Sequence, residues 1–326
     1  MAFRTIRTLI ISIALIAISS CVFAASPVIF VSNKGNDAND GTRAKPVKTL
    51  VEAYLDVSAG GIIFILTPDI VVPQNTFIGI GKSVTIEGVT GDAGIVRGVF
   101  NIGAGNIKVT LKNLHFVGDA TGGPASLMNI SSGNVTIDDC SFHVNNATTA
   151  IRVVQSSNLT ITHSTFNGAF TGIAVGDWAA EQIATGNVVI SDSTIEACHR
   201  GVWLEPNSTA GVAVSNDVIS NCDGSGVFGE GNAVQVKDCE LTGCNEALVS
   251  DTACSMDTYN DLLTHNTVAA IVNGASSITL ADDDITLNGT GLEYFTPGTG
   301  FFITFNNNRI LLNQASANPN VNEAFE

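Results

Sequence analysis

The chain of 326 residues carries 30 acidic and 14 basic side chains, a formal net charge of −16, and it contains 32 glycines. Its acidity argues against a nucleic-acid partner, because the phosphates would repel the protein. Abundant Gly, Asn, Ser and Thr, with few residues suited to long helices, favour one unusual domain. No linker-like change of composition follows residue 60.

The first 24 residues have the layout of a cleaved secretory signal. Arg4 and Arg7 precede an apolar run over residues 9–18, and Ala24 closes a short cleavage-site segment. We therefore expect export to the periplasm or the extracellular space, with no transmembrane segment in the mature chain. Cys21 lies in a stretch that resembles a bacterial lipobox, so a lipid anchor at Cys21 is the alternative. Without residues 1–24 the chain has 12 basic and 30 acidic residues, a net charge of −18.

Residues 25–60 are predicted to form an entry strand, a loop and a capping helix. The loop contains GNDANDGT at 35–42, in which Asn-Asp-Gly is a strong turn signal. The spacing of its carboxylates does not fit an EF-hand loop, so we predict a turn and not a metal site. Thr49 and Glu52 form a capping box, and the helix that they begin has an apolar face able to cover the end of the following structure.

A repeat organises the rest of the chain. Nine stretches, from VTLKNLHF at 109–116 to ITFNNNRI at 303–310, alternate apolar and polar residues and break at Asn, Asp or Ser. Their last residues are spaced by 22 to 29 positions and are Phe116, Phe142, Phe166, Ile195, Ile219, Leu241, Leu263, Ile285 and Ile310. Units of this size, each with a second short strand and no helix, predict a β-solenoid. The missing leucine-rich consensus argues against leucine-rich repeats.

A second column of residues lies three positions after each anchor. Its members are Asn145, Ala169, Cys198, Cys222, Cys244, Asn266, Asn288 and Asn313. Stacked Asn side chains can hydrogen-bond along the axis of a solenoid, and Cys replaces them as a small buried residue. This column is therefore predicted to be structural.

The repeat and the entry segment VIFVSNKGNDANDGTRAKPVKTLVEAY at 28–54 are similar to those of proteins of the pectate-lyase-like superfamily. This resemblance extends over about residues 28–313. It implies an all-β fold, a right-handed single-stranded parallel β-helix of about ten coils over residues 61–313, with a C-terminal tail at 314–326. It also implies a polysaccharide partner and lyase, hydrolase or epimerase chemistry, although the catalytic strings of those enzymes are absent from this chain.

Six cysteines remain after the signal segment: Cys140, Cys198, Cys222, Cys239, Cys244 and Cys254. An even count in an exported protein is typical of disulfides. However, Cys198, Cys222 and Cys244 occupy one column, and in-register side chains on parallel strands point the same way. Free buried thiols are therefore the favoured prediction, and disulfides are the alternative.

Alignment of the second strands indicates which side chains face outward. The residues predicted to point inward are Ile151, Ile173, Val202, Val227, Leu248 and Ile271. Trp203 and Phe228 then lie outside on consecutive coils, and together with Trp178 they are the predicted substrate-binding residues. Three positions after the inward residues lie Glu205, Glu230 and Asp251, with Asp177 one position off on the preceding coil. These four carboxylates are a candidate Ca²⁺ site, and a solvated acidic edge is the alternative.

The candidate catalytic residues are Arg200, His199 and Arg152. A uronate lyase needs a base and a cationic group that offsets the substrate carboxylate, roles for Arg200 or His199 and for Arg152. The primary hypothesis is an exported protein that binds polysaccharide on its solenoid face, with processing left open. The alternatives are a Ca²⁺-assisted polysaccharide lyase and a structural surface protein or adhesin. The sequence does not indicate an oligomeric state.

Overall fold

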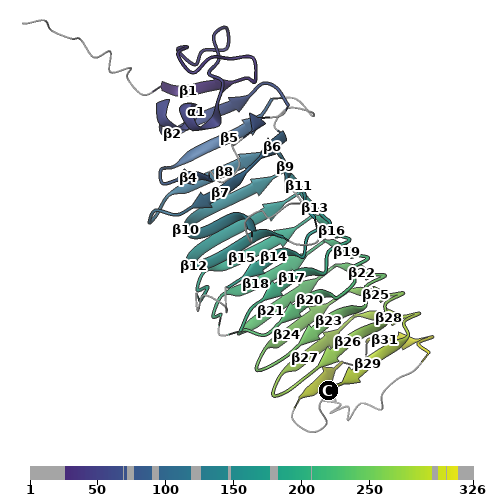
Figure 1. Ribbon diagram of the computed structural model, residues 1–326. Coiled ribbons are helices and arrows are strands. Elements are labelled where there is room, and N and C mark those ends of the chain that lie inside the picture. The colour runs from purple at the N-terminus through teal and green to yellow at the C-terminus, as the bar shows by residue number, and fades with distance from the viewer. Residues whose placement is uncertain are drawn as a thin grey trace, which may run out of the picture.

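The computed structural model describes residues 26–68, 70–71, 77–89, 95–118, 126–145, 148–176, 183–206, 208–295, 300–305 and 307–314. The expected signal segment lies outside this part of the chain. The strands stack into one long rod in which each coil lies on the one before (Figure 1). Within the described residues the strands of neighbouring coils pair in parallel, so the fold is a parallel β-helix.

The rod has three faces, each a parallel sheet of strands from successive coils. The first face contains β1 (Ser26–Val31), β2 (Val57–Ile65), β5 (Val84–Gly88), β8 (Lys108–Lys112), β10 (Ser126–Asp138), β12 (Thr149–Thr162), β15 (Asn187–Ser191), β18 (Gly211–Ser215), β21 (Ala233–Lys237), β24 (Ser255–Tyr259), β27 (Ser277–Ala281) and β30 (Phe301–Thr304). β10 and β12 are long enough to bend into the second face and to pair there as well.

The second face contains β4 (Phe77–Ile80), β7 (Val99–Ile102), the first parts of β10 and β12, β14 (Thr171–Val175), β17 (Arg200–Leu204), β20 (Ser225–Gly229), β23 (Glu246–Ser250), β26 (Val268–Val272) and β29 (Thr290–Tyr294). The third face is an eleven-stranded sheet of β3 (Ile70–Val71), β6 (Ile95–Arg97), β9 (His115–Val117), β11 (Ser141–His143), β13 (Thr165–Asn167), β16 (Thr194–Glu196), β19 (Val218–Ser220), β22 (Glu240–Thr242), β25 (Leu262–Thr264), β28 (Asp284–Thr286) and β31 (Arg309–Leu311). Within the described residues the rod has about nine turns, slightly fewer than the ten or so coils expected.

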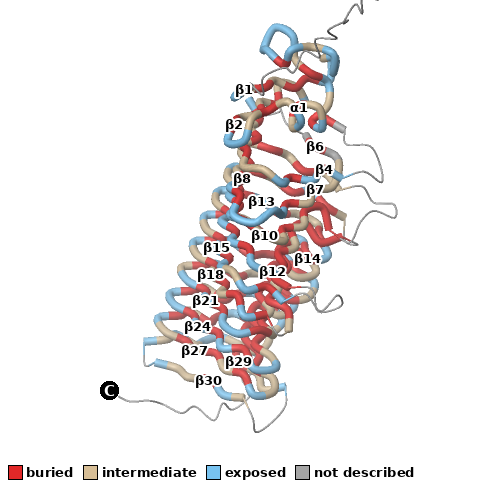
Figure 2. Tube along the Cα trace, turned by 90° about the vertical axis from the view of Figure 1, so that its left-hand side faces the viewer, coloured by how far each residue is buried: buried red, intermediate tan, exposed pale blue. Residues whose placement is uncertain are grey.

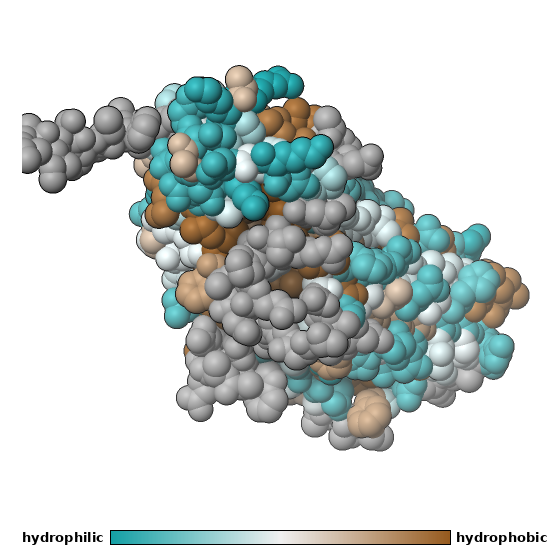
Figure 3. Space-filling model, turned by 45° about the horizontal axis from the view of Figure 1, so that its top comes forward, coloured by the Kyte–Doolittle hydropathy of each residue, from teal (hydrophilic) through white to brown (hydrophobic). Residues whose placement is uncertain are grey.

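A short helix, α1 (Leu50–Asp56), lies between β1 and β2 at the N-terminal end of the rod. The Thr49 side chain accepts a hydrogen bond from the backbone N–H of Glu52 at 3.2 Å, which is the predicted cap. Leu50 and Ala53 are buried, so the apolar face of the helix covers the first coil as expected. Figure 3 shows that hydrophilic side chains make up much of the described surface at this end.

The loop at 35–42 is a turn held by its own polar side chains. Asp37 accepts hydrogen bonds from the backbone N–H groups of Lys48 and Thr49, both at 2.8 Å, and so it fixes the chain just before α1. Gly41 has φ +70°, and a Cβ there would lie 2.7 Å from the side chain of Ile29. The turn interpretation of this stretch is confirmed.

The predicted anchor residues form one continuous column on the third face. Phe116, Phe142 and Phe166 pair in register, and their rings stack at centroid distances of 4.7 Å. The same register continues through the aliphatic anchors to Ile310. Figure 2 shows the buried positions along the inside of the coils and the exposed positions at their corners. The repeat therefore predicted the core.

The prediction was wrong for one of the six residues expected to point inward on the second face, Ile271. Leu248 pairs with Ala270, and Ile271 pairs with the outward residue Val249. The reason is a column of small residues, each directly before an inward residue. A Cβ at Gly201 would lie 2.5 Å from the carbonyl oxygen of Gly226, so this position has no room for a larger side chain. Ala269 takes this small position, and Ala270 consequently points inward.

The predicted asparagine ladder is present. The backbone N–H of Cys244 donates to Asn266 Oδ1 at 2.8 Å, that of Asn266 to Asn288 Oδ1 at 2.9 Å, and that of Asn288 to Asn313 Oδ1 at 2.9 Å. The amide nitrogens of Asn266 and Asn288 donate in turn to carbonyl groups of Leu241 and Leu263. These bonds satisfy backbone groups at a corner where the strands no longer pair.

A second interior ladder, which the sequence analysis missed, uses carboxylates. The backbone N–H groups of residues one coil earlier donate to Oδ1 of Asp217 at 2.6 Å, of Asp261 at 2.8 Å and of Asp283 at 2.9 Å. All three side chains are buried. Burial raises the pKa of Asp217 to about 7 and that of Asp261 to about 8, against the opposing effect of the hydrogen bonds from backbone N–H groups.

All six cysteines after residue 24 are buried and unpaired, as the column argument favoured. Burial raises the pKa of Cys140 and of Cys239 to about 12. Such thiols are poorly nucleophilic because the thiolate is the reactive form.

This carboxylate ladder predicts that the protein is more stable in mild acid than in base. The folded chain keeps Asp217 and Asp261 protonated to about pH 7 and 8, whereas the unfolded chain releases these protons near pH 4. The stabilisation is therefore present in acid and is lost as the pH rises through 7 to 8. We expect the Tm to fall by several degrees between pH 5 and pH 9, and Asp261→Asn to flatten this fall. The exposed control Asp139→Asn should keep the wild-type slope, and a Tm independent of pH would contradict the prediction.

The cysteines predict a simple labelling result. Iodoacetamide should label none of the six thiols in the native protein within minutes, because burial removes both access and thiolate character. After denaturation without reductant, mass spectrometry should find all six labelled. Label that appears only after reductant is added would instead show disulfides.

Candidate functional site

A shallow hollow lies on the second face where β17 and β20 run side by side. It is lined by Arg200, Trp203, Pro206, Phe228 and Glu230 and has a volume of about 450 Å³. Trp203 and Phe228 are direct neighbours in the sheet register, as the alignment predicted. The structure therefore brings together one predicted catalytic residue, two predicted binding aromatics and one predicted metal ligand.

Arg200 covers the two aromatic rings. Its guanidinium carbon lies 4.3 Å from the ring centroid of Trp203 and 4.9 Å from that of Phe228. The two rings are 6.3 Å apart and inclined by 25°. Arg200 is the first residue of β17, and Gly201, which follows it, packs closely against the carbonyl group of Gly226 on the next coil. Burial lowers the pKa of Arg200, while nearby carboxylates oppose this effect.

Glu230 supplies the acidic group of the hollow. Its Oε2 accepts a hydrogen bond from the indole Nε1 of Trp203 at 2.8 Å, which fixes both side chains. Burial raises the pKa of Glu230, and Asp251 raises it further, whereas the Trp203 bond and Arg200 lower it. The hollow thus offers apolar ring surface, a planar cation and a carboxyl group within one small area. These are the groups that hold a flat, hydroxyl-rich ligand.

Arg152 and Glu205 bind each other. Arg152 Nη1 lies 2.7 Å from Glu205 Oε1, and the same nitrogen donates to the carbonyl oxygen of Gly176 at 2.9 Å. The Glu205 side chain is completely buried, and that of Arg152 is 16% exposed. Ala174 separates Arg152 from Trp203 in the sheet, and its small side chain leaves room for the arginine to reach across to Glu205. This contact joins coils that are not adjacent.

The predicted acidic column follows the expected backbone register. The N–H groups of Glu205, Glu230 and Asp251 donate to Val175, Leu204 and Gly229 of the preceding coils. Their carboxylates nevertheless have different partners, since Asp251 accepts from the N–H of Thr252. Among the described residues they do not form a cluster with convergent ligand atoms. Asp177 and Trp178 lie outside the described residues, so the four-residue Ca²⁺ site stays a prediction.

His199 lies beside the hollow and not in its lining. Its Nδ1 is 2.9 Å from Asp223 Oδ1, and its ring stacks on Phe170 with a centroid distance of 4.9 Å. His199 was predicted as a site residue, but its contacts with Phe170 and Asp223 were not. The repeat could have indicated both contacts, because Phe170 and Asp223 lie at the same corner on the two adjacent coils.

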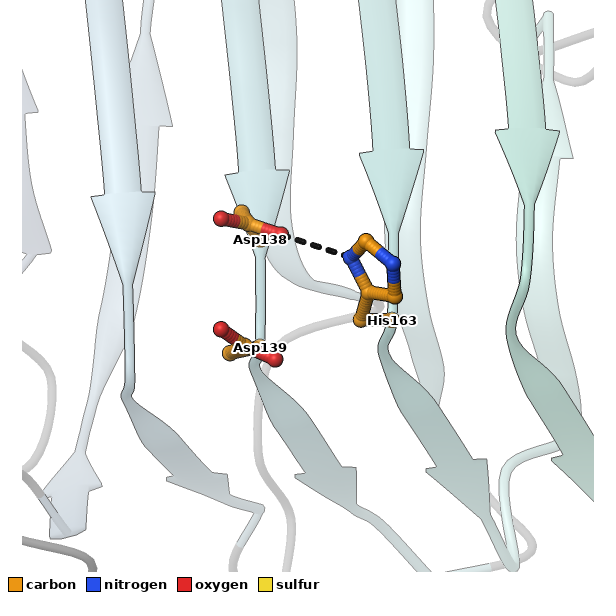
Figure 4. A group of neighbouring side chains, drawn as sticks. All are labelled: Asp138, Asp139 and His163. Atoms are coloured by element: carbon orange, nitrogen blue, oxygen red, sulfur yellow. Dashed lines mark hydrogen bonds and ion pairs between the residues drawn. The ribbon is translucent and has the colours of Figure 1, made fainter.

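One convergent group of possible metal ligands does occur among the described residues, on a corner of the rod. Asp138, Asp139 and His163 each place a ligand atom within 4.8 Å of the others (Figure 4). A carboxylate and imidazole set of this kind suits transition metals. However, Asp138 already binds His163 Nδ1 at 3.0 Å and Lys112 Nζ at 3.2 Å. The hydrogen bond from His163 lowers the pKa of Asp138, and the ion pairs account for this cluster without a metal.

Comparison with known proteins agrees with this architecture. The family model for the right-handed β-helix region matches residues 74–241 and 184–321. The chain therefore belongs to the right-handed β-helix family, and the predicted fold class is confirmed. No curated protein matches the chain significantly.

Several solved structures share the fold at low sequence identity. A complex of XylC with xylose has a TM-score of 0.51 and 10% identity, over 87% of this chain and 70% of that one. Pectate lyase Pel9A has a TM-score of 0.49 and 12% identity, over 91% and 81%. A lacto-N-biosidase of family GH136 from Eubacterium ramulus has a TM-score of 0.47 and 13% identity, over 89% and 66%. The XylC complex, with its TM-score of 0.51 and 10% identity, shows a shared fold and no more than that.

Within the described residues no helix is long and apolar enough to cross a membrane, since α1 has only seven residues.

The buried ion pair predicts a large difference between two arginine substitutions. Arg152→Ala removes the arginine that binds the buried Glu205 carboxylate, which costs ~3–5 kcal/mol of the free energy of unfolding. Arg309→Ala removes an exposed ion pair with Asp284 and should cost less than ~1 kcal/mol. Urea unfolding followed by circular dichroism measures both. Equal losses would show that the Arg152 pair does not stabilise the rod.

Proposed function

We propose that this protein is exported and binds polysaccharide in the hollow between β17 and β20. One observation carries the proposal: Trp203 and Phe228 lie side by side on the outer surface, with the Arg200 guanidinium over both rings and Glu230 hydrogen-bonded to the indole Nε1. The fold supports it at a coarser level, because structures of the same fold include polysaccharide-acting enzymes. The acidity of the chain further disfavours a nucleic-acid ligand.

Each group in the hollow has a defined role in this proposal. The apolar faces of a sugar ring contact Trp203 and Phe228, whose rings have few conformations to lose on binding. The Arg200 guanidinium donates to sugar oxygens, and Glu230 accepts from sugar hydroxyl groups or, when protonated, also donates. Since Trp203 is hydrogen-bonded to Glu230, the site is held in place before a ligand arrives.

The lyase alternative receives less support from the same contacts. It assigns Arg152 to the substrate carboxylate and Glu205 to Ca²⁺, but these two side chains bind each other. A ligand in the hollow leaves the contact between Arg152 and Glu205 intact, because neither residue lines the hollow. A structural surface protein or adhesin would need no soluble ligand in the hollow. Substitutions in the hollow therefore separate binding from the adhesin alternative, and an activity assay separates binding from a lyase.

Trp203→Ala should abolish retention on polysaccharide. Affinity electrophoresis through gels that contain xylan, β-glucan, pectin or alginate identifies a ligand for the wild type, and isothermal titration calorimetry then measures the affinity. Loss of the indole should weaken binding at least about tenfold, which corresponds to ~1.4 kcal/mol.

Tyr259→Ala is the matched control, because Tyr259 is an exposed aromatic on β24 with Lys237 Nζ 5.5 Å from its ring. It removes an aromatic and cation contact from another face and should leave binding unchanged. A wild-type protein that none of these polysaccharides retards, or equal binding by Trp203→Ala, would refute the proposal. Unsaturated products released from pectin or alginate would instead identify a lyase.

A further inference from the structure

A second aromatic pair lies next to the hollow at the corner that leads into the second face. Phe170 and His199 occupy equivalent positions on consecutive coils, since Arg200 N donates to Phe170 O at 2.8 Å. Their rings stack with centroids 4.9 Å apart and an angle of 23° between the planes. Phe170 is 40% exposed, and the His199 side chain is 37% exposed. Both rings are therefore only partly covered by the protein and can be reached by a ligand.

The imidazole of His199 is held in one orientation. Its Nδ1 lies 2.9 Å from Asp223 Oδ1, and this contact fixes the ring. On the next coil Gly224 leaves room for the ring, because a Cβ there would lie 2.9 Å from His199 Cε1. With Nδ1 directed at Asp223, the other ring nitrogen, Nε2, is the one that can bind a ligand. A sugar hydroxyl group is a suitable donor for that nitrogen.

The two aromatic pairs lie along the same strand. His199 directly precedes Arg200, and Trp203 lies four positions after His199, so the two pairs are at most ~13 Å apart along the chain. That distance exceeds one sugar ring and suits a short run of linked rings. Arg200 begins β17 directly after His199, and its guanidinium lies over Trp203 and Phe228.

We propose that Phe170 and His199 form a second sugar subsite, so that the site takes an extended oligosaccharide lying along β17 and across the axis of the rod. This inference rests on the proposed function, because it extends the same site. It places Trp203 and Phe228 at one sugar and Phe170 and His199 at another. Asp223 is a positioning residue for His199 and does not itself contact the ligand.

The test compares oligosaccharides of increasing length, from disaccharide to hexasaccharide, prepared from whichever of the four polysaccharides binds. Calorimetry of the wild type should show affinity rising with length until both subsites are filled. Phe170→Ala should bind the disaccharide as the wild type does and lose severalfold to tenfold in affinity for the longest oligosaccharides. Phe170→Tyr keeps the ring and should restore the dependence on length. Phe77→Ala removes another exposed phenylalanine of the second face and should change nothing.

The outcomes separate the inference from the function on which it rests. If Trp203→Ala loses binding at every length while Phe170→Ala behaves as the wild type at every length, the second subsite is refuted and the hollow stands. If Trp203→Ala binds as the wild type, both proposals fail. Equal weakening of all lengths by Phe170→Ala, with an unchanged Tm, would also overturn the inference, because the residue would then act on the first subsite.

Discussion

The structure depends on one constraint, the in-register parallel pairing of each coil with the next at ~4.8 Å. Every residue consequently lies on its equivalent in the neighbouring coil, and any side chain that suits one corner is repeated along the rod. This explains why phenylalanines stack on phenylalanines and asparagines on asparagines. It also explains how interior corners keep their backbone N–H groups satisfied, since each is served by a side chain one coil further on.

The same constraint decides what the sequence could predict. The anchors and the asparagine column repeat one kind of residue, so their spacing identified them without a structure. The carboxylate ladder was not predicted because its column mixes residue types. The equivalent positions on consecutive coils are occupied by Ser193, Asp217, Cys239 and Asp261. An Asp after an Asn also reads as a solvated turn, whereas here the preceding residue takes positive φ and turns the Asp inward. Ala270 was missed for a similar reason, since a run of five small and apolar residues has no visible period.

The candidate site was predictable to the extent that it follows register. Trp203 and Phe228 lie at equivalent positions of adjacent repeats, and their contact was expected from the alignment. Arg152 and Glu205 are separated by an intervening coil, and no local pattern links them. Side-chain length, and not register, decides such contacts, as with Arg200 folding back over two rings. For the same reason the acidic column had the right backbone positions but its described carboxylates have different partners.

The loop before α1 has a consequence for assembly. A rod built wholly from parallel pairing has, at each end, a strand edge able to recruit another chain, much as a fibril end does. Here the outer edge of β1 is paired with the loop at 41–47, since the N–H of Phe30 donates to Gly41 O at 2.8 Å and the N–H of Val47 donates to Phe30 O at 3.0 Å. These backbone groups are therefore not available to a new strand. A short loop thus protects this end of the stack, and duplicated coils are accommodated between the two ends without disturbing it.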